Sequence, residues 1–125
     1  MAAVLIIDDD ARGTEPLARL LRQEGHEATL VSTVREALSE LRSNPPDLVL
    51  LDLSLPRVDG LDLLDAMNAE PRLAGLRVAV YSGRDDEQSI RSAKELGAQD
   101  FIQKGRGWDH VIERIRANLA TVPMA

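Results

Sequence analysis

The chain has 125 residues, 44% hydrophobic and 29% charged, which is ordinary for a globular protein and enough for one domain with a buried core. With 21 acidic against 15 basic residues its formal charge is −6, which argues against a domain that grips a nucleic-acid backbone. The absence of cysteine excludes disulfides and thiolate metal sites. The apolar runs are too short to span a membrane, and a strand pattern begins too close to the N-terminus for a signal peptide, so we expect a cytoplasmic protein.

Two predicted strands end in carboxylates. The apolar run Ala3–Ile7 leads into the acids Asp8–Asp10, and Leu48–Leu51, within the stretch PDLVLLDLSLPRVDG, leads into Asp52. Continuous apolar runs of this length are typical of strands in parallel sheets that are covered on both faces. A carboxylate at the carboxyl end of such a strand lies where open α/β sheets bind ligands.

The first predicted helix contains an awkward proline. Leucines recur at helical spacing before Gly25, which is a good helix stop. If the helix began directly after the acids, Pro16 would remove one of its hydrogen bonds. With Thr14 as the N-cap, Pro16 would fall in the first turn and cost nothing. We therefore predict a late-starting or kinked helix.

The rest of the chain alternates between strands and helices. Thr33 to Glu36 has the pattern of a capping box, and Gly97 ends a later helix. This alternation predicts an α/β fold, a flavodoxin-like doubly wound sheet of five parallel strands in the order 2-1-3-4-5 with five helices on both faces. The remaining predicted strands are Glu27–Val31, Arg77–Tyr81 and Asp100–Gln103. Of the remaining helices, one begins at Val34, one follows Gly60 and one is capped by Asp85 or Asp86. The last helix has the buried stripe Trp108, Val111, Ile112, Ile115 and Leu119.

Three acids are expected to converge in one crevice, because Asp8, Asp9 and Asp52 leave the ends of the first and third strands, where the strand order reverses. Crowded carboxylates raise one another's pKa values unless a cation joins them. Oxygen ligands without His or Cys suit Mg²⁺ or Mn²⁺. Acids also gather at helix N-termini for electrostatic reasons, but that explanation does not account for Asp52.

Two further polar residues follow predicted strands. Ser82 comes after the fourth strand and Lys104 after the fifth. A lysine can balance the acids, and a hydroxyl can donate to a phosphoryl oxygen. Each residue alone also fits a simpler role, a solvated surface lysine or a helix-capping serine. Their joint position at strand ends favours the functional interpretation.

Across essentially its whole length the chain resembles the receiver domains of response regulators, the phosphoacceptor half of two-component signalling. We therefore expect residues 1–125 to form a single receiver domain. The spacing between the matching motifs agrees with that of the family. These motifs are IIDD (Ile6–Asp9), LLDLSLPRVDG (Leu50–Gly60), YSG (Tyr81–Gly83) and DFIQK (Asp100–Lys104).

The resemblance implies a reaction and a metal site. Asp52 would accept a phosphoryl group from a phosphohistidine on a histidine kinase or a histidine phosphotransfer protein. Asp9 would be a direct ligand of Mg²⁺, with Mn²⁺ also suitable, and Asp8 would act mostly through water. Asp52 itself and the backbone carbonyl of Ser54 would complete the protein ligands.

The resemblance also implies a switch. Lys104 would pair with Asp52 and then with the phosphoryl oxygens, and Ser82 would hydrogen-bond the phosphoryl group. Phe101 would be the switch aromatic that turns inward when Ser82 moves. A downstream effector protein or domain would read the change on the fourth helix, fifth strand and fifth helix. The domain would be no enzyme beyond its own phosphorylation and slow dephosphorylation, and would bind neither nucleic acid nor membrane.

Three residues depart from the family pattern or vary within it. Gly105 stands where many members have proline, so we expect a more mobile loop after Lys104. Gly83 stands where alanine is common. Arg84, a long cation near the acceptor, is expected to help screen the acidic crevice and to alter the lifetime of the phosphoryl group.

Other functions compete with this one. A Mg²⁺-dependent phosphohydrolase with an aspartyl nucleophile normally carries a second acid two residues further on, where this chain has Ser54. A flavodoxin-type nucleotide binder would need a Gly- or Ser/Thr-rich phosphate loop in place of Asp8–Asp10. A receiver-like module that binds partners without phosphorylation would not need the complete set of acids, serine and lysine. The chain could be a stand-alone receiver or a piece of a larger regulator or hybrid kinase.

Overall fold

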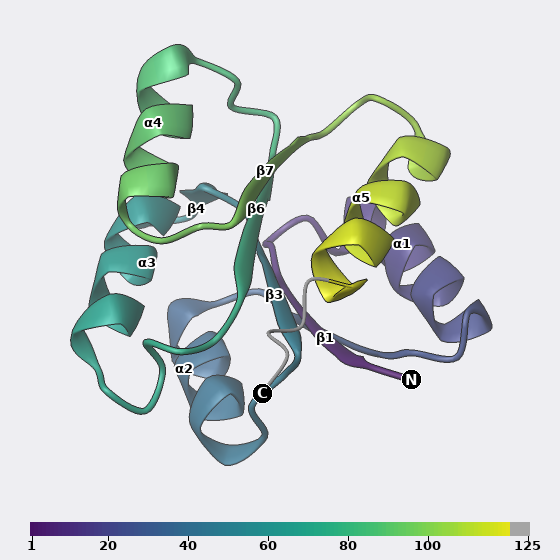
Figure 1. Cartoon of the computed structure of the whole chain (residues 1–125), viewed down its shortest axis with the longest axis horizontal. Helices are drawn as coiled ribbons and strands as arrows, with labels where there is room; N and C mark the ends of the chain where they lie inside the picture. The colour runs from purple at the N-terminus through teal and green to yellow at the C-terminus, as the bar shows by residue number, and fades with distance from the viewer. Residues whose placement is uncertain (121–125) are drawn as a thin grey trace.

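A parallel sheet of five strands forms the centre of this computed structural model, which describes residues 1–120 (Figure 1). The strand order is β2-β1-β3-β6-β7, which is 2-1-3-4-5 when only these strands are counted, so the predicted flavodoxin-like α/β fold is confirmed. Residues 121–125, which the expected domain includes, lie outside the described residues. The strands are β1 (Ala3–Ile7), β2 (Glu27–Val31), β3 (Leu48–Leu51), β6 (Val78–Ser82) and β7 (Asp100–Gln103).

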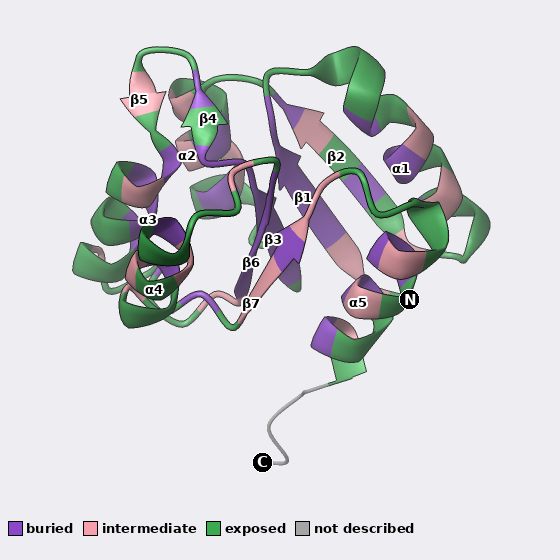
Figure 2. Cartoon of the chain, turned by 90° about the horizontal axis from the view of Figure 1, so that it is seen from above, coloured by how far each residue is buried: buried purple, intermediate pink, exposed green. Residues whose placement is uncertain are grey.

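Five helices cover both faces of the sheet, and their outer surfaces are exposed (Figures 1 and 2). One face carries α1 (Ala11–Gln23) and α5 (Trp108–Ala120). The other carries α2 (Val34–Ser43), α3 (Gly60–Ala69) and α4 (Glu87–Glu95). Within residues 1–120, no helix is both long and apolar enough to cross a membrane.

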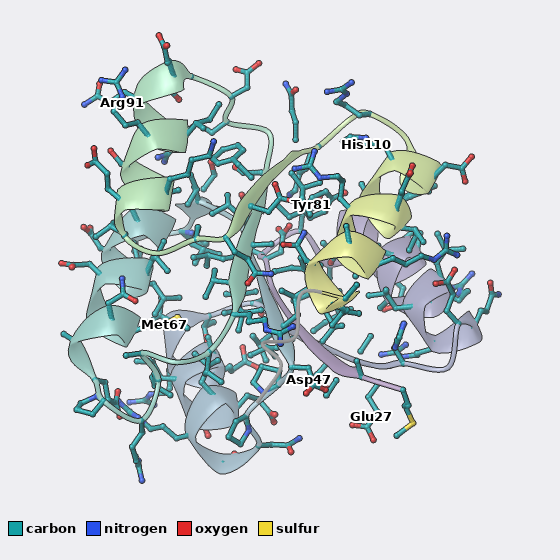
Figure 3. The ribbon with its side chains drawn as sticks, viewed as in Figure 1. Glu27, Asp47, Met67, Tyr81, Arg91 and His110 are labelled. Carbon is teal, nitrogen blue, oxygen red and sulfur yellow. The ribbon has the colours of Figure 1, made fainter. Side chains whose placement is uncertain are left out.

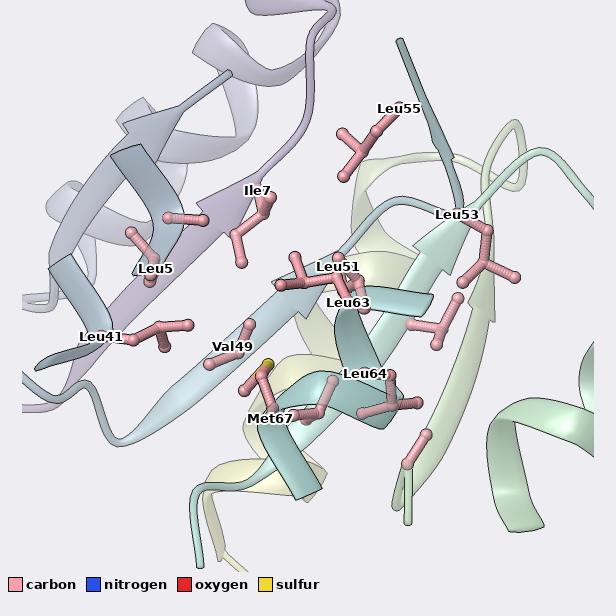
Figure 4. Packing of buried hydrophobic residues seen from close by; sticks show 14 of the residues in the cluster. Leu5, Ile7, Leu41, Val49, Leu51, Leu53, Leu55, Leu63, Leu64 and Met67 are labelled. Carbon is pink, nitrogen blue, oxygen red and sulfur yellow. The ribbon is translucent and has the colours of Figure 1, made fainter. Parts of the chain in front are cut away.

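Alternate residues of each central strand enter two separate cores. In β1, Val4 and Ile6 pack toward α1 and α5, whereas Leu5 and Ile7 pack toward α2, α3 and α4. Figure 4 shows the second of these cores, in which Leu51 of β3 meets the leucines of α3. Because successive strand side chains point to opposite faces, burial on both faces requires an uninterrupted apolar run.

A small hairpin, which the sequence patterns did not reveal, follows β3. Its strands are β4 (Ser54–Leu55) and β5 (Val58–Asp59), and they pair antiparallel. The turn between them contains Arg57 at φ 66°, directly after a proline, which is the pattern of a type II turn. Leu55 is buried, so the hairpin is held against the core and brings Asp59 to the start of α3.

The late start predicted for α1 is wrong. The helix begins at Ala11 and passes through Pro16 without interruption, with Asp10 rather than Thr14 as its N-cap. The Asp10 side chain accepts a hydrogen bond of 3.1 Å from the N–H of Gly13, which satisfies one of the free donors at the helix start. The carbonyl that loses its partner to Pro16 belongs to Arg12, which is exposed, so water can satisfy it. The local cost of the proline is therefore small.

One strand boundary and one buried position differ from the sequence-based expectation. Ser82 is the last residue of β6 rather than the residue after it, because its backbone pairs with Gln103 of β7. Trp108 is not part of the buried stripe of α5: it is the first residue of that helix and is 39% exposed. The stripe begins one turn later, at Val111.

We expect that replacing Gly60 with alanine destabilises the protein by about 1–3 kcal/mol. A Cβ atom on Gly60 would lie 2.6 Å from the carbonyl oxygen of Asp52 and 2.6 Å from the Cα atom of Leu53. Backbone atoms packed beside a buried strand cannot move aside cheaply. Gly75→Ala is the matched control, because a Cβ there meets nothing within 4 Å among the described residues. Equal urea-unfolding midpoints for the two variants would contradict this account.

Candidate functional site

The register of the sheet brings the predicted acids together. Ile7 of β1 is the partner of Leu51 of β3, so Asp8 and Asp52 follow neighbouring strand ends. The N–H of Asp52 continues the ladder by donating to the carbonyl of Ile7 at 2.9 Å. Asp9 lies next to them, and one carboxylate oxygen from each of the three acids lies within 4.8 Å of the others.

The two acids at the strand ends are nearly fully buried. Asp8 is 4% exposed and Asp52 is 5% exposed, while Asp9 is open to solvent. Backbone N–H groups fix both carboxylates: Asp10 donates to Asp8 at 2.9 Å, and Ser54 donates to Asp52 at 3.1 Å. Buried carboxylates need such partners, and here each retains an oxygen that faces its neighbours.

Lys104 supplies the counter-charge. Its Nζ atom donates to Asp8 at 2.6 Å and to Asp52 at 3.5 Å, so the ammonium lies closer to Asp8. The lysine follows β7, and its backbone N–H donates to the carbonyl of Ser82 at 2.9 Å. Nζ also lies 5.4 Å from the ring centre of Tyr81, which packs between β6 and α5 (Figure 3).

Burial and charge perturb this group of residues. Burial is the largest influence on Asp8 and raises its pKa, although the hydrogen bonds from Lys104 and from the backbone of Asp10 act in the opposite direction. For Lys104, burial lowers the pKa, but the hydrogen bond to Asp8 and the charges of Asp8 and Asp52 outweigh it, and the pKa is raised. Burial also raises the pKa of Tyr81. The ammonium is thus held charged between two carboxylates.

Ser82 and Phe101 lie on the neighbouring strands. Ser82 is fully buried, and its hydroxyl oxygen accepts a hydrogen bond of 3.2 Å from the N–H of Arg84. Because a hydroxyl carries one donor and two acceptor sites, this bond leaves its proton available. Phe101 of β7 is half-buried and packs against the core formed with α2, α3 and α4. Ser82 and Lys104 therefore lie with the acids at one end of the sheet, whereas Phe101 pairs with Val80 further back along the strands.

The donor set fits a hard divalent cation. Asp8, Asp9 and Asp52 offer only oxygen atoms, as Mg²⁺ prefers, and Asp9 leaves the group open to water, which Mg²⁺ retains when bound. Asp8 and Asp52 carry two carboxylates against the single ammonium of Lys104, so the group has charge left for a cation to balance. The residues present are therefore suited to hold such an ion.

Sequence reasoning missed one contact beside the site. The guanidinium of Arg84 lies 3.4 Å from Asp59 and donates to the carbonyl of Leu53 at 3.4 Å. Asp59 is the N-cap of α3, since its carboxylate accepts a hydrogen bond of 2.9 Å from the N–H of Leu61. No local pattern connects it to Arg84, because the unpredicted hairpin brings the two together.

The loop after Lys104 contains two glycines in the left-handed region. Gly105 has φ 89° and Gly107 has φ 88°, values that other residues rarely adopt. These glycines allow the chain to turn from β7 into α5, where Gly107 accepts the hydrogen bond from Val111. The greater mobility expected for this loop stays a prediction.

Comparison with known proteins identifies the family. The family model of the response regulator receiver domain matches residues 4–116. The chain belongs to this family. The structure of the receiver domain of HemR from Leptospira biflexa, in its non-phosphorylated form, superimposes on this one with a TM-score of 0.91 at 26% identity, covering 100% of this chain and 99% of that one.

Curated relatives of this receiver domain are response regulators. Over 119 residues it is 40% identical to the sensory transduction protein RegX3 of Mycolicibacterium smegmatis, covering 95% of this chain and 51% of RegX3. Over 116 residues it is 34% identical to the DNA-binding response regulator MtrA of Mycobacterium leprae, covering 93% of this chain and 50% of MtrA. The receiver domain thus spans about half the length of the curated relatives that it matches.

We expect Lys104→Met to destabilise the receiver domain by about 1–3 kcal/mol at neutral pH, because it leaves two buried carboxylates without their counter-ion. The raised pKa of Asp8 means that its charged form costs stability in the folded state, and this cost disappears once the group is protonated. The loss caused by the substitution should therefore shrink as the pH falls from neutrality toward the ordinary aspartate value of 3.8.

Urea unfolding in EDTA at a series of pH values measures this effect. Lys94→Met is the matched control, because Lys94 lies exposed on α4. The counter-ion role would be ruled out if the loss of unfolding free energy caused by Lys104→Met stayed constant with pH, or if it equalled the loss caused by Lys94→Met.

Proposed function

We propose that Asp52 of this receiver domain accepts a phosphoryl group from a phosphohistidine on a histidine kinase or a histidine phosphotransfer protein. The observation that carries the proposal is the placement of Asp52, 5% exposed at the end of β3, among two further acids and the ammonium of Lys104. The N–H of Ser54 fixes one oxygen of this buried carboxylate, and the other oxygen has only a long 3.5 Å contact with Lys104, so it can act as a nucleophile.

In the proposed transfer, an oxygen of Asp52 attacks phosphorus in line with the phosphorus–nitrogen bond of the phosphohistidine. As the new oxygen–phosphorus bond forms, the phosphorus–nitrogen bond breaks and its electrons return to the imidazole. Phosphoryl transfer depends mainly on positioning and on stabilising charge on the equatorial oxygens. Lys104 lies 3.5 Å from Asp52 and would bind one of these oxygens.

The proposed metal site consists of Asp8, Asp9, Asp52 and the backbone carbonyl of Ser54, with Mg²⁺ as the expected ion and Mn²⁺ as an alternative. Such an ion would neutralise charge on the phosphoryl oxygens. The observation that supports it is the approach of the three carboxylates to within 4.8 Å. Asp8 also has to share its carboxylate with Lys104, which agrees with a role mostly through water for this acid.

The proposed output depends on Ser82 and Phe101. Ser82 would donate its hydroxyl proton to a phosphoryl oxygen, and Phe101 would turn further inward as the β6–α4 loop follows Ser82. The surface of α4, β7 and α5 would then change and be read by an effector protein or by an effector domain of a longer chain. Ile90, Phe101 and His110 line a groove on this surface.

We further propose that residues 1–125 act as a single cytoplasmic receiver domain without a catalytic cycle of its own, beyond self-phosphorylation and slow dephosphorylation. Its net charge of −6 argues against direct binding to nucleic acid or to anionic lipid, both of which are negatively charged. The complete set of acids, serine and lysine favours phosphorylation over a module that binds partners without it.

Incubation with acetyl phosphate and Mg²⁺ is expected to add one phosphoryl group to the wild-type chain and none to Asp52→Asn. Intact-protein mass spectrometry measures the gain. EDTA should abolish it, because three acids without a cation repel an incoming phosphate.

Asp65→Asn is the matched control, since it removes an exposed carboxylate on α3 away from the acidic cluster. It should be phosphorylated like the wild type. A phosphoryl gain that survives Asp52→Asn would overturn the assignment of the acceptor.

A further inference from the structure

Arg84, in the β6–α4 loop, lies beside the proposed phosphoryl site. Its backbone N–H binds the hydroxyl of Ser82 at 3.2 Å, and its guanidinium binds the carbonyl of Leu53, the residue after Asp52, at 3.4 Å. Arg84 is therefore bonded both to Ser82 of the proposed phosphoryl site and to the backbone next to Asp52. A cation in this position is within reach of the space that a phosphoryl group on Asp52 would occupy.

The contact that holds the guanidinium in place is weak. Nη1 lies 3.4 Å from both carboxylate oxygens of Asp59, longer than the 2.7–2.9 Å usual for charge-assisted hydrogen bonds. The side chains are 30% and 42% exposed for Arg84 and Asp59, so water screens the attraction. Exposed ion pairs of this kind contribute little. The guanidinium can therefore exchange partners at small cost.

Asp59, in contrast, is fixed. Its carboxylate accepts the N–H of Leu61 at 2.9 Å as the N-cap of α3, and its backbone pairs with Ser54 across the small hairpin. Gly60 then packs directly on the backbone of Asp52. When a phosphoryl group arrives, Arg84 is thus the partner that moves and Asp59 is the partner that stays.

We propose that Asp59 is a positioning residue that holds the Arg84 guanidinium away from the acceptor, and that a phosphoryl group on Asp52 competes with Asp59 for this guanidinium. A phosphoryl group carries nearly two negative charges against the single charge of Asp59, and the planar guanidinium fork fits its oxygens. The inference rests on the proposed phosphorylation of Asp52.

The exchange affects how long the phosphoryl group lasts. In hydrolysis, a water oxygen bonds to phosphorus while the bond from phosphorus to the Asp52 oxygen breaks, giving inorganic phosphate, the free carboxylate and a proton released to solvent. The Arg84 side chain is 30% exposed, so it stands at the border between the proposed site and solvent. A guanidinium on the phosphoryl oxygens therefore occupies part of the path by which water approaches phosphorus. Asp59 shortens the phosphoryl lifetime by drawing the guanidinium back.

Asp59→Asn should lengthen the lifetime of the phosphorylated form by up to about fivefold, the range expected when an exposed ion pair is removed. Asparagine caps a helix as well as aspartate, so the start of α3 is retained while the charge is lost. Arg84→Ala should shorten the lifetime and keep the backbone bond to Ser82. In the double variant, Asp59→Asn should have no further effect, because the residue through which it acts is gone.

The experiment follows loss of the phosphoryl group by mass spectrometry after removal of acetyl phosphate, with urea unfolding of each unphosphorylated variant as the second readout. Glu70→Gln is the matched control, since it removes another partly exposed pair, with Arg42, and should leave the lifetime unchanged. The inference would be overturned if the phosphorylated form of Asp59→Asn lasted no longer than that of the wild type. It would also be overturned if Asp59→Asn lengthened the lifetime equally in the Arg84→Ala background. A wild-type chain that takes up no phosphoryl group at all would instead overturn the proposed function.

Discussion

Two nearly fully buried carboxylates, those of Asp8 and Asp52, share a single counter-charge, the ammonium of Lys104. The rest of the site depends on this imbalance of charge. The folded protein tolerates it because backbone N–H groups bind both acids and because the strands that carry them are fixed by cores on both faces of the sheet. The same imbalance makes the group suited to gain a divalent cation.

The interaction connects distant parts of the chain. Lys104 can contact Asp8 because β1, β3, β6 and β7 are neighbours in the sheet and their carboxyl ends lie at the same edge. The residues that follow β1 and β7, Asp8 and Lys104, then lie beside the carboxylate of Asp52, which follows β3. Lys104 connects Asp52 to Ser82, since its ammonium binds the carboxylate and its backbone N–H binds the Ser82 carbonyl. The hydroxyl of Ser82 in turn accepts the N–H of Arg84 in the β6–α4 loop. These contacts are the ones through which the proposed switch would act.

Much of this arrangement could be predicted from the sequence, because apolar runs that end in polar residues mark both the strands and their carboxyl ends. Local competition was harder to predict. Asp10 and Thr14 are both good N-caps, and in the structure Asp10 fills this role, while the buried Thr14 lies within the helix and its hydroxyl donates to the carbonyl of Asp10. The contact of Arg84 with Asp59 depends on the two-residue strands β4 and β5, which are too short to leave a periodic pattern. The preference of Lys104 for Asp8 is a matter of one ångström in side-chain placement, which no residue pattern encodes.

The account centres on Asp52 as the acceptor, and locating the phosphoryl group tests it most directly. Borohydride reduces an aspartyl phosphate to homoserine, and peptide mass spectrometry then reads the position of the modified residue. After treatment with acetyl phosphate and Mg²⁺, the account predicts homoserine at position 52 and at no other aspartate. Homoserine at position 8 or 9, or a phosphorylated chain without homoserine at position 52, would contradict it.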